Sequence, residues 1–246
     1  MYLHNREELQ ALRKSAEAAL HAPGIRILVC AGTGCIASGS KDIYDKMKSL
    51  CEGNNGVSVE FEGEVPHPEI KKSGCHGFCE MGPLMRIEPL GILYIKVKVE
   101  DCEEIYEKTI CHGEAIDRLL YHKDGQVYQS EESIPFYAGQ MRLVLKNCGH
   151  IDAENIEEYI AVGGYQALEK VLFDVDQEEG LSIIEEANLR GRGGGGFPAG
   201  KKWKQVAHQK EKERYIVCNG DEGDPGAFMD RSIMEGDPHK MLEGML

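Results

Sequence analysis

The chain has 246 residues, enough for one large domain or two modest ones. Charged residues make up 28% and hydrophobic residues 41%, an ordinary balance for a soluble globular protein. The formal net charge of −14 argues against a nucleic-acid-binding surface, and no apolar run approaches the ~20 residues of a membrane span.

The amino terminus predicts a helix rather than an export signal. Residues 1–21 contain no apolar signal core, and Asn5 followed by Glu8 is a pattern that starts helices. Without an export signal, the nine cysteines favour thiols or metal ligands over disulfides. The sequence therefore predicts a cytoplasmic protein.

Residues 25–122 predict a small α/β domain, preceded by a helical segment over 1–24. Apolar or alternating runs predict strands at 25–29, 57–61, 85–87 and 92–97. Apolar stripes predict helices at 40–51 and at 101–111, the second with Asp101 as its cap and Glu104 at the capping-box position. The resulting order, βαβ followed by ββα, is that of a thioredoxin-like domain.

Four cysteines occupy glycine-rich loops at the ends of these strands. Cys30 ends the first strand and Cys35 follows it, while Cys75 and Cys79 bracket the sequence His-Gly-Phe. Glycine lets backbone N–H groups approach sulfur, and four converging thiolates in such loops suit a [2Fe–2S] cluster. We therefore predict that these four cysteines ligate a [2Fe–2S] cluster.

Three other interpretations of the four cysteines compete with the cluster. Structural zinc prefers paired spacings of two residues, whereas the gaps here are four and three residues and the pairs lie far apart. Buried unliganded thiols need no flanking glycines, and disulfides do not suit the predicted compartment. His76 could replace a cysteine as a ligand, but we expect it only to lie in the loop. The remaining cysteines are expected to be core or incidental thiols: Cys51, Cys102, Cys111, Cys148 and Cys218.

A second domain is expected at 136–246, after a polar linker at 123–135. Two helices follow from Asp152 and are separated by a pair of glycines, Gly163 and Gly164. A third helix is predicted at 176–189 and a strand at 215–218.

The stretch 189–203 holds six glycines, two arginines and two lysines in fifteen residues. Clustered N–H groups and cations form an anion cradle, which predicts a site for a phosphate or a phosphorylated cofactor. The G-x-G-x-x-G run at 191–196 follows a helix, not the strand that a dinucleotide fingerprint needs. The G-x-x-x-x-G-K run at 195–201 precedes Lys202, where a P-loop needs Ser or Thr. The alternative is a flexible linker, although such linkers are rich in glycine and serine.

A polar stretch, 218–231, follows the predicted strand and contains Asn219 and four acids: Asp221, Glu222, Asp224 and Asp230. Ligands bind at the carboxyl ends of strands in open α/β sheets. These side chains could therefore hold a divalent metal or accept hydrogen bonds from a ribityl chain, a ribose or a flavin ring. The alternative is an acidic surface turn.

Together the two stretches resemble the flavin-binding subunit shared by NADH dehydrogenases, NAD-linked formate dehydrogenases and electron-bifurcating hydrogenases. The similarity continues through Pro238-His239-Lys240 and back to Asn147-Cys148-Gly149, over about residues 140–246. The cysteine pattern resembles the thioredoxin-like [2Fe–2S] ferredoxin. The expected fold is therefore α/β, a thioredoxin-like [2Fe–2S] domain followed by the N-terminal part of a Rossmann-like FMN/NAD-binding domain.

The resemblance implies that the glycine loop and its lysine hold FMN. The residues that would line the phosphate and the isoalloxazine are Gly191, Arg192, Gly193 and Gly194. Lys202 would reach the flavin, and Phe197 would stack near the nicotinamide or adenine unless it is an ordinary core aromatic.

The resemblance also implies that Asn219, Asp221 and Glu222 hydrogen-bond the flavin ring and ribityl chain. Asp224 stands where a glutamate is usual, and Gln205 stands where an aromatic often stacks on the adenine. These two differences leave the choice between NAD and NADP open.

Related subunits continue for several hundred residues and carry a further [4Fe–4S] cluster there. We expect that cluster only if this chain continues beyond Leu246, as a fragment of a longer subunit would.

The implied function is that of an NAD(H)-linked oxidoreductase subunit, in which flavin takes hydride from NADH and passes single electrons to iron–sulfur centres. Gly195, in place of the alanine of the respiratory form, favours a soluble NAD(H)-dependent hydrogenase, with electron bifurcation left open. A formate dehydrogenase or a respiratory complex is the alternative. The expected partners are other redox subunits, NADH and, as an option, a ferredoxin. A stand-alone [2Fe–2S] carrier and a zinc-stabilised interaction domain are the alternatives from other classes.

Overall fold

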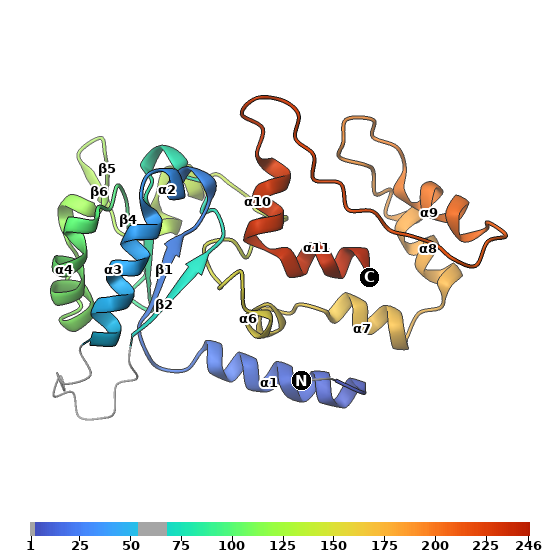
Figure 1. Ribbon diagram of the computed structural model, residues 1–246, viewed down its shortest axis with the longest axis horizontal. Helices are drawn as coiled ribbons and strands as arrows, with labels where there is room; N and C mark the ends of the chain where they lie inside the picture. The colour runs from blue at the N-terminus through green and yellow to red at the C-terminus, as the bar shows by residue number, and fades with distance from the viewer. Residues whose placement is uncertain (1–2, 54–67) are drawn as a thin grey trace.

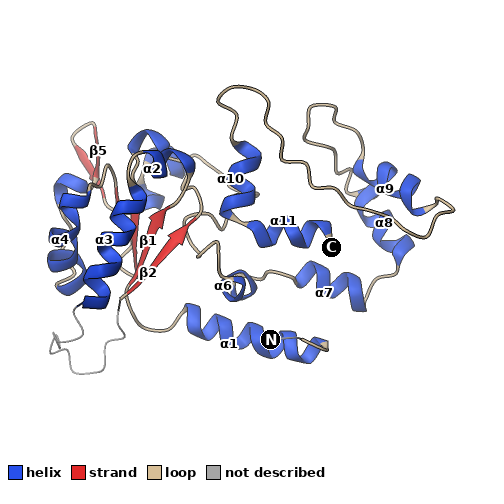
Figure 2. Cartoon of the chain, viewed as in Figure 1, coloured by secondary structure: helices blue, strands red, loops and turns tan. Residues whose placement is uncertain are grey.

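The computed structural model describes residues 3–53 and 68–246 (Figure 1). A sheet with helices packed on it forms one part, and a group of helices and long loops forms the other (Figure 2). No helix of the described residues is long and apolar enough to cross a bilayer.

The sheet has four strands in the order β2-β1-β3-β4. They are β1 (Arg26–Cys30), β2 (Glu69–Ser73), β3 (Met85–Glu88) and β4 (Ile92–Tyr94). β1 pairs with β2 in parallel and with β3 antiparallel, and β3 pairs with β4 antiparallel. Residues 27–30 of β1 are all buried, as expected of a central strand covered on both faces. This topology confirms the predicted thioredoxin-like fold.

Helices cover the sheet, and their apolar side chains pack with those of the strands in two clusters. α3 (Ser40–Gly53) places Ile43 and Met47 against Ile27 and Ile87 in the larger cluster. The smaller cluster joins Cys30 and Cys35, the latter in α2 (Thr33–Ala37), to residues after β4. The cysteine loops therefore rest directly on a packed core.

The helix predicted at 101–111 forms, but Asp101 does not cap it as predicted. A 3₁₀ turn, Val99–Asp101, starts the segment earlier, and α4 (Cys102–Glu104) then continues as a π-helix, Ile105–Cys111. Because Asp101 is already inside the turn, its carboxylate accepts a hydrogen bond from the Lys98 N–H at 2.8 Å.

The strand predicted at 57–61 lies outside the described residues, and β2 was not anticipated. β2 has the sequence Glu-Ile-Lys-Lys-Ser, which lacks the apolar alternation of a typical strand. It forms an edge of the sheet, where Lys71 pairs with Glu158 of the helical part.

The segment 123–135, expected to be a linker, is instead folded against the sheet. β5 (Tyr121–Lys123) and β6 (Gln126–Tyr128) form a hairpin around Asp124 and Gly125, both with positive φ. A 3₁₀ turn, Glu131–Ser133, and α5 (Pro135–Ala138) follow. Glu131 is buried and accepts a hydrogen bond from Arg86 of β3 at 2.7 Å, which fixes the segment in place.

The helical part contains α6 (Ile156–Ala161), α7 (Gln166–Phe173), α8 (Gln177–Glu186), α9 (Ala199–Ala207), α10 (Met229–Gly236) and α11 (Pro238–Met245). The predicted break at Gly163 and Gly164 is confirmed, because α6 ends at Ala161 and α7 begins at Gln166. A side chain at Gly164 would overlap the Tyr159 ring. Asp176 caps α8 by accepting from the Glu179 N–H at 2.9 Å.

The strand predicted at 215–218 is wrong. Tyr215, Ile216 and Val217 lie in an extended loop and are 81%, 67% and 83% exposed. Within 136–246, all of it described, no strand is available to pair with this segment. High β-propensity is therefore not sufficient here, because a strand also needs a neighbour for its backbone groups.

The predicted amino-terminal helix forms as α1 (Arg6–Leu20), capped by Asn5. It packs on α6 and not on the sheet, with Ala16 and Leu20 buried against Ala161 (Figure 1). Its Arg6 also pairs with Glu169 of α7 at 2.7 Å. The first helix of the chain therefore belongs structurally with the last hundred residues.

Candidate functional site

The structure brings the four predicted cluster cysteines together. Cys30 ends β1, Cys35 lies in α2, Cys75 follows β2, and Cys79 begins the 3₁₀ turn Cys79–Met81. The Sγ atoms of Cys75 and Cys79 are 3.9 Å apart, and the Cys30 thiol is within hydrogen-bonding reach of Cys35 and Cys75. Three of the four side chains are buried, and Cys79 is exposed.

Two glycines leave room for the sulfur atoms. A Cβ on Gly82 would lie 2.7 Å from the Cys35 Sγ, and a Cβ on Gly32 would lie 2.8 Å from the Cys75 Cβ. Neither position could carry a side chain without displacing a cysteine. The glycine-rich character of these loops therefore has a steric reason.

Backbone N–H groups point at the sulfurs. The Gly77 N–H donates to the Cys75 Sγ at 3.4 Å, and the backbone at His76 and Leu84 donates to Cys30 and Cys35. Such donors stabilise thiolates, which are the form that binds metal.

The thiols of Cys30 and Cys35 differ in pKa. The hydrogen bond to Cys35 raises the pKa of the Cys30 thiol to about 12, and the same bond lowers the pKa of Cys35. Ligation of a metal would release this shared proton, because each ligand binds as a thiolate.

The donor set suits a [2Fe–2S] cluster. Four thiols, glycine-lined loops and N–H groups directed at sulfur are the elements of such a site. Across 3–53 and 68–246, no three His, Cys, Asp or Glu side chains gather around a single ion position. A [2Fe–2S] cluster takes only two protein thiolates on each iron, so it needs no group of three around one ion.

His76 is a fully buried ring beside the ligand loop. Its Nε2 lies 2.7 Å from the Ser73 Oγ, and its Nδ1 is buried without a hydrogen-bond partner. Burial lowers the pKa of His76 to about 3, so the ring is neutral. Its Cγ lies 3.2 Å from where a Cβ on Gly149 would stand, so the ring packs the loop against the helical part.

The predicted FMN residues of the glycine loop lie together at the surface. The Gly191 N–H donates to the Phe197 carbonyl at 2.9 Å, which closes the loop at its base. The loop is open at 193–196, because a Cβ placed on any of these four glycines would meet no atom within 4 Å, and Gly194 and Gly196 have positive φ. Arg192 and Lys202 are exposed, and Phe197 is half exposed.

A helix begins directly after this loop, which sequence reasoning missed. α9 starts at Ala199 and carries Lys202 in its first turn, so that its free N–H groups adjoin the glycines. Gly200 lets α9 approach α8, since a Cβ there would lie 2.6 Å from the Glu185 Cα. The signal was Pro198 at the N-cap, followed by good helix formers.

The acidic residues lie in a second loop that runs up to α10. Asn219 accepts a hydrogen bond from the Asp221 N–H at 2.9 Å, and the Asp224 carbonyl accepts from the Ala227 N–H at 3.1 Å. Glu222 accepts from the backbone N–H of Asp230 at 2.8 Å and so caps α10. The described residues contain no hydrogen bond between this loop and the glycine loop.

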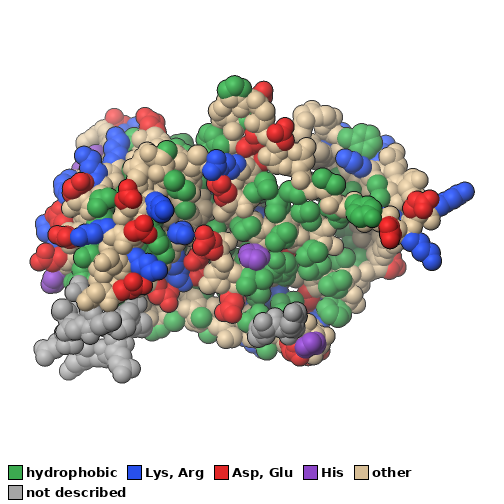
Figure 3. Space-filling view, in the orientation of Figure 1, with side chains coloured by type: hydrophobic (Ala, Val, Ile, Leu, Met, Phe, Trp, Pro, Cys, Tyr) green, Lys and Arg blue, Asp and Glu red, His purple; other side chains and the backbone are tan. Residues whose placement is uncertain are grey.

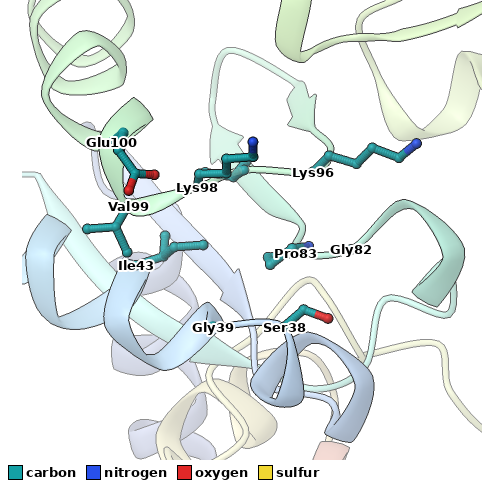
Figure 4. A pocket seen from close by; sticks show the side chains of 10 residues that line it. Ser38, Gly39, Ile43, Gly82, Pro83, Lys96, Lys98, Val99 and Glu100 are labelled. Atoms are coloured by element: carbon teal, nitrogen blue, oxygen red, sulfur yellow. The ribbon is translucent and has the colours of Figure 1, made fainter.

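Two cavities flank the cysteine loops. One, of about 440 Å³, lies between the cluster loop and α10, with Cys75, Cys79, Phe136 and Phe228 among its lining residues. The other, of about 340 Å³, lies beside Gly82 and Pro83, with Lys96 and Lys98 at its edge (Figure 4). The predicted cysteines line only the first.

Apolar side chains gather on the exposed face of the helical part, whereas charged side chains crowd the sheet part (Figure 3). The exposed apolar residues of the helical part include Leu172, Phe173, Trp203 and Leu242. Exposed apolar surfaces of this kind are typical of interaction sites and ligand-binding grooves.

Comparison with known proteins confirms the predicted resemblance for the carboxyl-terminal part. Residues 184–246 match the Nuo51 FMN-binding domain family. The chain is 49% identical over 106 residues to the "NADP-reducing hydrogenase subunit HndC" of Solidesulfovibrio fructosivorans, a match that covers 43% of this chain and 21% of that protein. It is 47% identical over 103 residues to an NADH-quinone oxidoreductase subunit of Rhizobium meliloti, covering 42% and 24%.

Among solved structures, the chain resembles a thioredoxin-like [2Fe–2S] ferredoxin from Aquifex aeolicus at 26% identity and a TM-score of 0.35, over 42% of this chain and 94% of that one. The chain spans between a fifth and a quarter of the length of the curated relatives above.

Proposed function

We propose that this chain is part of an electron-transferring flavin and iron–sulfur subunit of an NAD(H)-dependent oxidoreductase. The observation that carries the proposal is the convergence of four cysteines in glycine-lined loops beside a segment similar to the Nuo51 FMN-binding domain. Its setting would be the cytoplasm, with other redox subunits as partners.

In this proposal Cys30, Cys35, Cys75 and Cys79 hold a [2Fe–2S] cluster. The cavity at Cys75 and Cys79 has aromatic side chains, Phe78, Phe136 and Phe228, among its lining residues. Backbone N–H groups at Gly77 and Leu84 stabilise the ligand sulfurs.

The glycine loop and α9 would bind the FMN phosphate. Open N–H groups at 193–196, Arg192 and Lys202 supply positive charge, and the start of α9 adds its helix dipole. Asn219, Asp221 and Glu222 would orient the ring and ribityl chain, Phe197 would lie toward the nicotinamide or adenine, and Asp224 would contact the nucleotide. When bound, FMN would accept hydride from NADH and pass single electrons to iron–sulfur centres.

Within this class we favour a hydrogenase subunit, because Gly195 and the similarity to a hydrogenase subunit both point that way. A respiratory or formate dehydrogenase subunit is the second candidate, and the similarity to an NADH-quinone oxidoreductase subunit supports the respiratory one. Electron bifurcation belongs to the first candidate, and a ferredoxin is an optional further partner.

We expect Lys202→Ala to lower FMN affinity in a chain that also carries the remainder of the domain found in its relatives. A charge-assisted contact contributes about 1.5–3 kcal/mol, so the dissociation constant of FMN should rise by roughly ten- to a hundredfold. Asp221→Ala should act in the same direction. Both variants should keep the [2Fe–2S] absorbance, because the cysteines lie in the other part of the chain.

The measurement is the FMN content after gel filtration, with iron content determined in parallel. Lys204→Ala is the control, because Lys204 lies on the same helix but pairs with Glu185 on α8. Full FMN retention in both Lys202→Ala and Asp221→Ala would remove these residues from the site.

A further inference from the structure

Helix α10 lies between the predicted flavin loop and the cluster loop. Its amino-terminal end follows the acidic stretch that contains Glu222, and its carboxyl-terminal end meets the segment that leads into Cys75. Figure 1 shows α10 between the sheet and helices α8 and α9. It is therefore one of the elements through which the two parts touch beside the cluster.

The carboxyl-terminal end of α10 is packed backbone to backbone on the cluster loop. A Cβ on Gly74 would lie 2.5 Å from the Gly236 Cα. A Cβ on Gly236 would lie 2.7 Å from the Cys148 Sγ and 3.7 Å from the Cys75 backbone nitrogen. Two glycines facing each other thus allow a contact next to a cluster ligand that no other residue type would permit.

A buried hydrogen bond fixes this contact. The Asn147 side-chain N–H donates to the Asp237 carboxylate at 2.8 Å, and both side chains are at least nine-tenths buried. Asp237 directly follows Gly236 and begins the turn into α11. A buried charge-assisted bond of this kind holds its partners in one arrangement.

The amino-terminal end of α10 is held by the acidic loop and faces the same cluster loop. Glu222 accepts hydrogen bonds from the N–H groups of Asp230 and Arg231, at 2.8 and 3.3 Å. Phe228 and Met229, at the start of the helix, line the cavity whose opposite wall includes Cys75 and Cys79. Both ends of the helix therefore lie near the cluster loop.

We propose that α10 is a positioning element that links the Glu222 loop to the cluster, so that a change at either end of the helix alters the environment of the [2Fe–2S] cluster. The proposal rests on the cluster of the proposed function. Glu222 holds the beginning of the helix, and Gly236 with Asp237 holds its end against Gly74 and Cys75. A ligand that drew Glu222 away from α10 would loosen the wall of the cluster cavity.

Gly236→Ala is the most direct test. The chain 1–246 is reconstituted with iron and sulfide, the EPR g-values of the reduced cluster are recorded, and the loss of visible absorbance in a chelator is timed. Overpacking beside Cys75 should shift the g-values and speed cluster loss by roughly tenfold. Cys148→Ala removes the sulfur that the new methyl group would meet, so Gly236→Ala combined with Cys148→Ala should restore much of the original signal.

Gly200→Ala is the matched control. Its Cβ would meet the Glu185 backbone at 2.6 Å, an equally close contact, but between α8 and α9 and away from the cysteines. It should destabilise the helical part without moving the g-values. If Gly236→Ala, like Gly200→Ala, destabilises the protein but leaves the g-values unchanged, Gly236 has only a structural role. That result would overturn the proposal.

Glu222→Ala provides a second variant that leaves the packed glycines intact. Loss of the helix cap should speed cluster loss by about fivefold. Glu235→Ala removes an acid from the same helix that only forms a surface pair with Arg231, so it should have no effect. Unchanged g-values and loss rates in both Gly236→Ala and Glu222→Ala would refute the link. A wild-type chain that takes up no iron would instead refute the proposed cluster itself.

Discussion

Cys75→Ala should abolish the visible absorbance and the EPR signal of the reconstituted chain. Cys75 lies within reach of Cys30, and its Sγ is 3.9 Å from that of Cys79, so its loss removes a ligand from the centre of the group. Gly32 leaves room for the Cys75 side chain, since a Cβ on Gly32 would lie 2.8 Å from the Cys75 Cβ. Iron content and visible absorbance measure the effect.

Cys51→Ala is the control for this variant. Cys51 is also buried and free, but it lies on α3 in the larger apolar cluster, on the other face of the sheet. Burial raises the pKa of its thiol to about 11. The Cys51→Ala variant should keep the full visible absorbance of the cluster. Full iron content and an unchanged EPR signal in Cys75→Ala would show that the ligand set is wrong.

The second large effect concerns the 246-residue chain by itself, which should hold its [2Fe–2S] cluster but bind no stoichiometric FMN. All four cysteines rest on the thioredoxin-like core, and a unit of about 100 residues can form such a core independently. The flavin site has no comparable support. The apolar segment 215–217 is exposed, and no hydrogen bond of the described residues joins the glycine loop to the acidic loop.

A half-lined site cannot desolvate a flavin or align a nicotinamide for hydride transfer. The test is to purify residues 1–246, reconstitute iron and FMN, and measure bound flavin together with NADH-driven dye reduction. The result expected is one cluster per chain with little flavin and negligible NADH oxidation. One tightly bound FMN per chain with rapid NADH turnover would contradict this account of where the site ends.

The sequence predicted the sheet part well where strands are apolar and central. The runs at β1, β3 and β4 are buried on the sheet and were recognisable from composition. β2 was missed because an edge strand that pairs only on one side tolerates the sequence Glu-Ile-Lys-Lys-Ser. The 123–135 segment was misjudged because its polarity concealed a hairpin, although Asp124-Gly125 is a strong signal for the turn.

The sequence was sufficient to predict the group of four cysteines, but not the contacts that surround α10. The cysteines could be grouped from the sequence because strand ends bring their loops to one edge of a sheet. The cap that Glu222 provides to α10, and the contact between Gly74 and Gly236, could not be found, because both depend on how distant segments pack. The strand at 215–218 failed for the same reason, since its expected neighbours are not part of the described fold. The roles of the glycine and acidic loops in binding FMN stay predictions.

Metal and sulfide analysis of the purified chain, combined with EPR of the dithionite-reduced sample, tests the central claim most directly. The account predicts two irons and two sulfides per chain and the rhombic signal of a reduced [2Fe–2S] cluster, ligated by Cys30, Cys35, Cys75 and Cys79. Stoichiometric zinc without iron or sulfide would contradict it, and would make the protein a zinc-stabilised interaction domain.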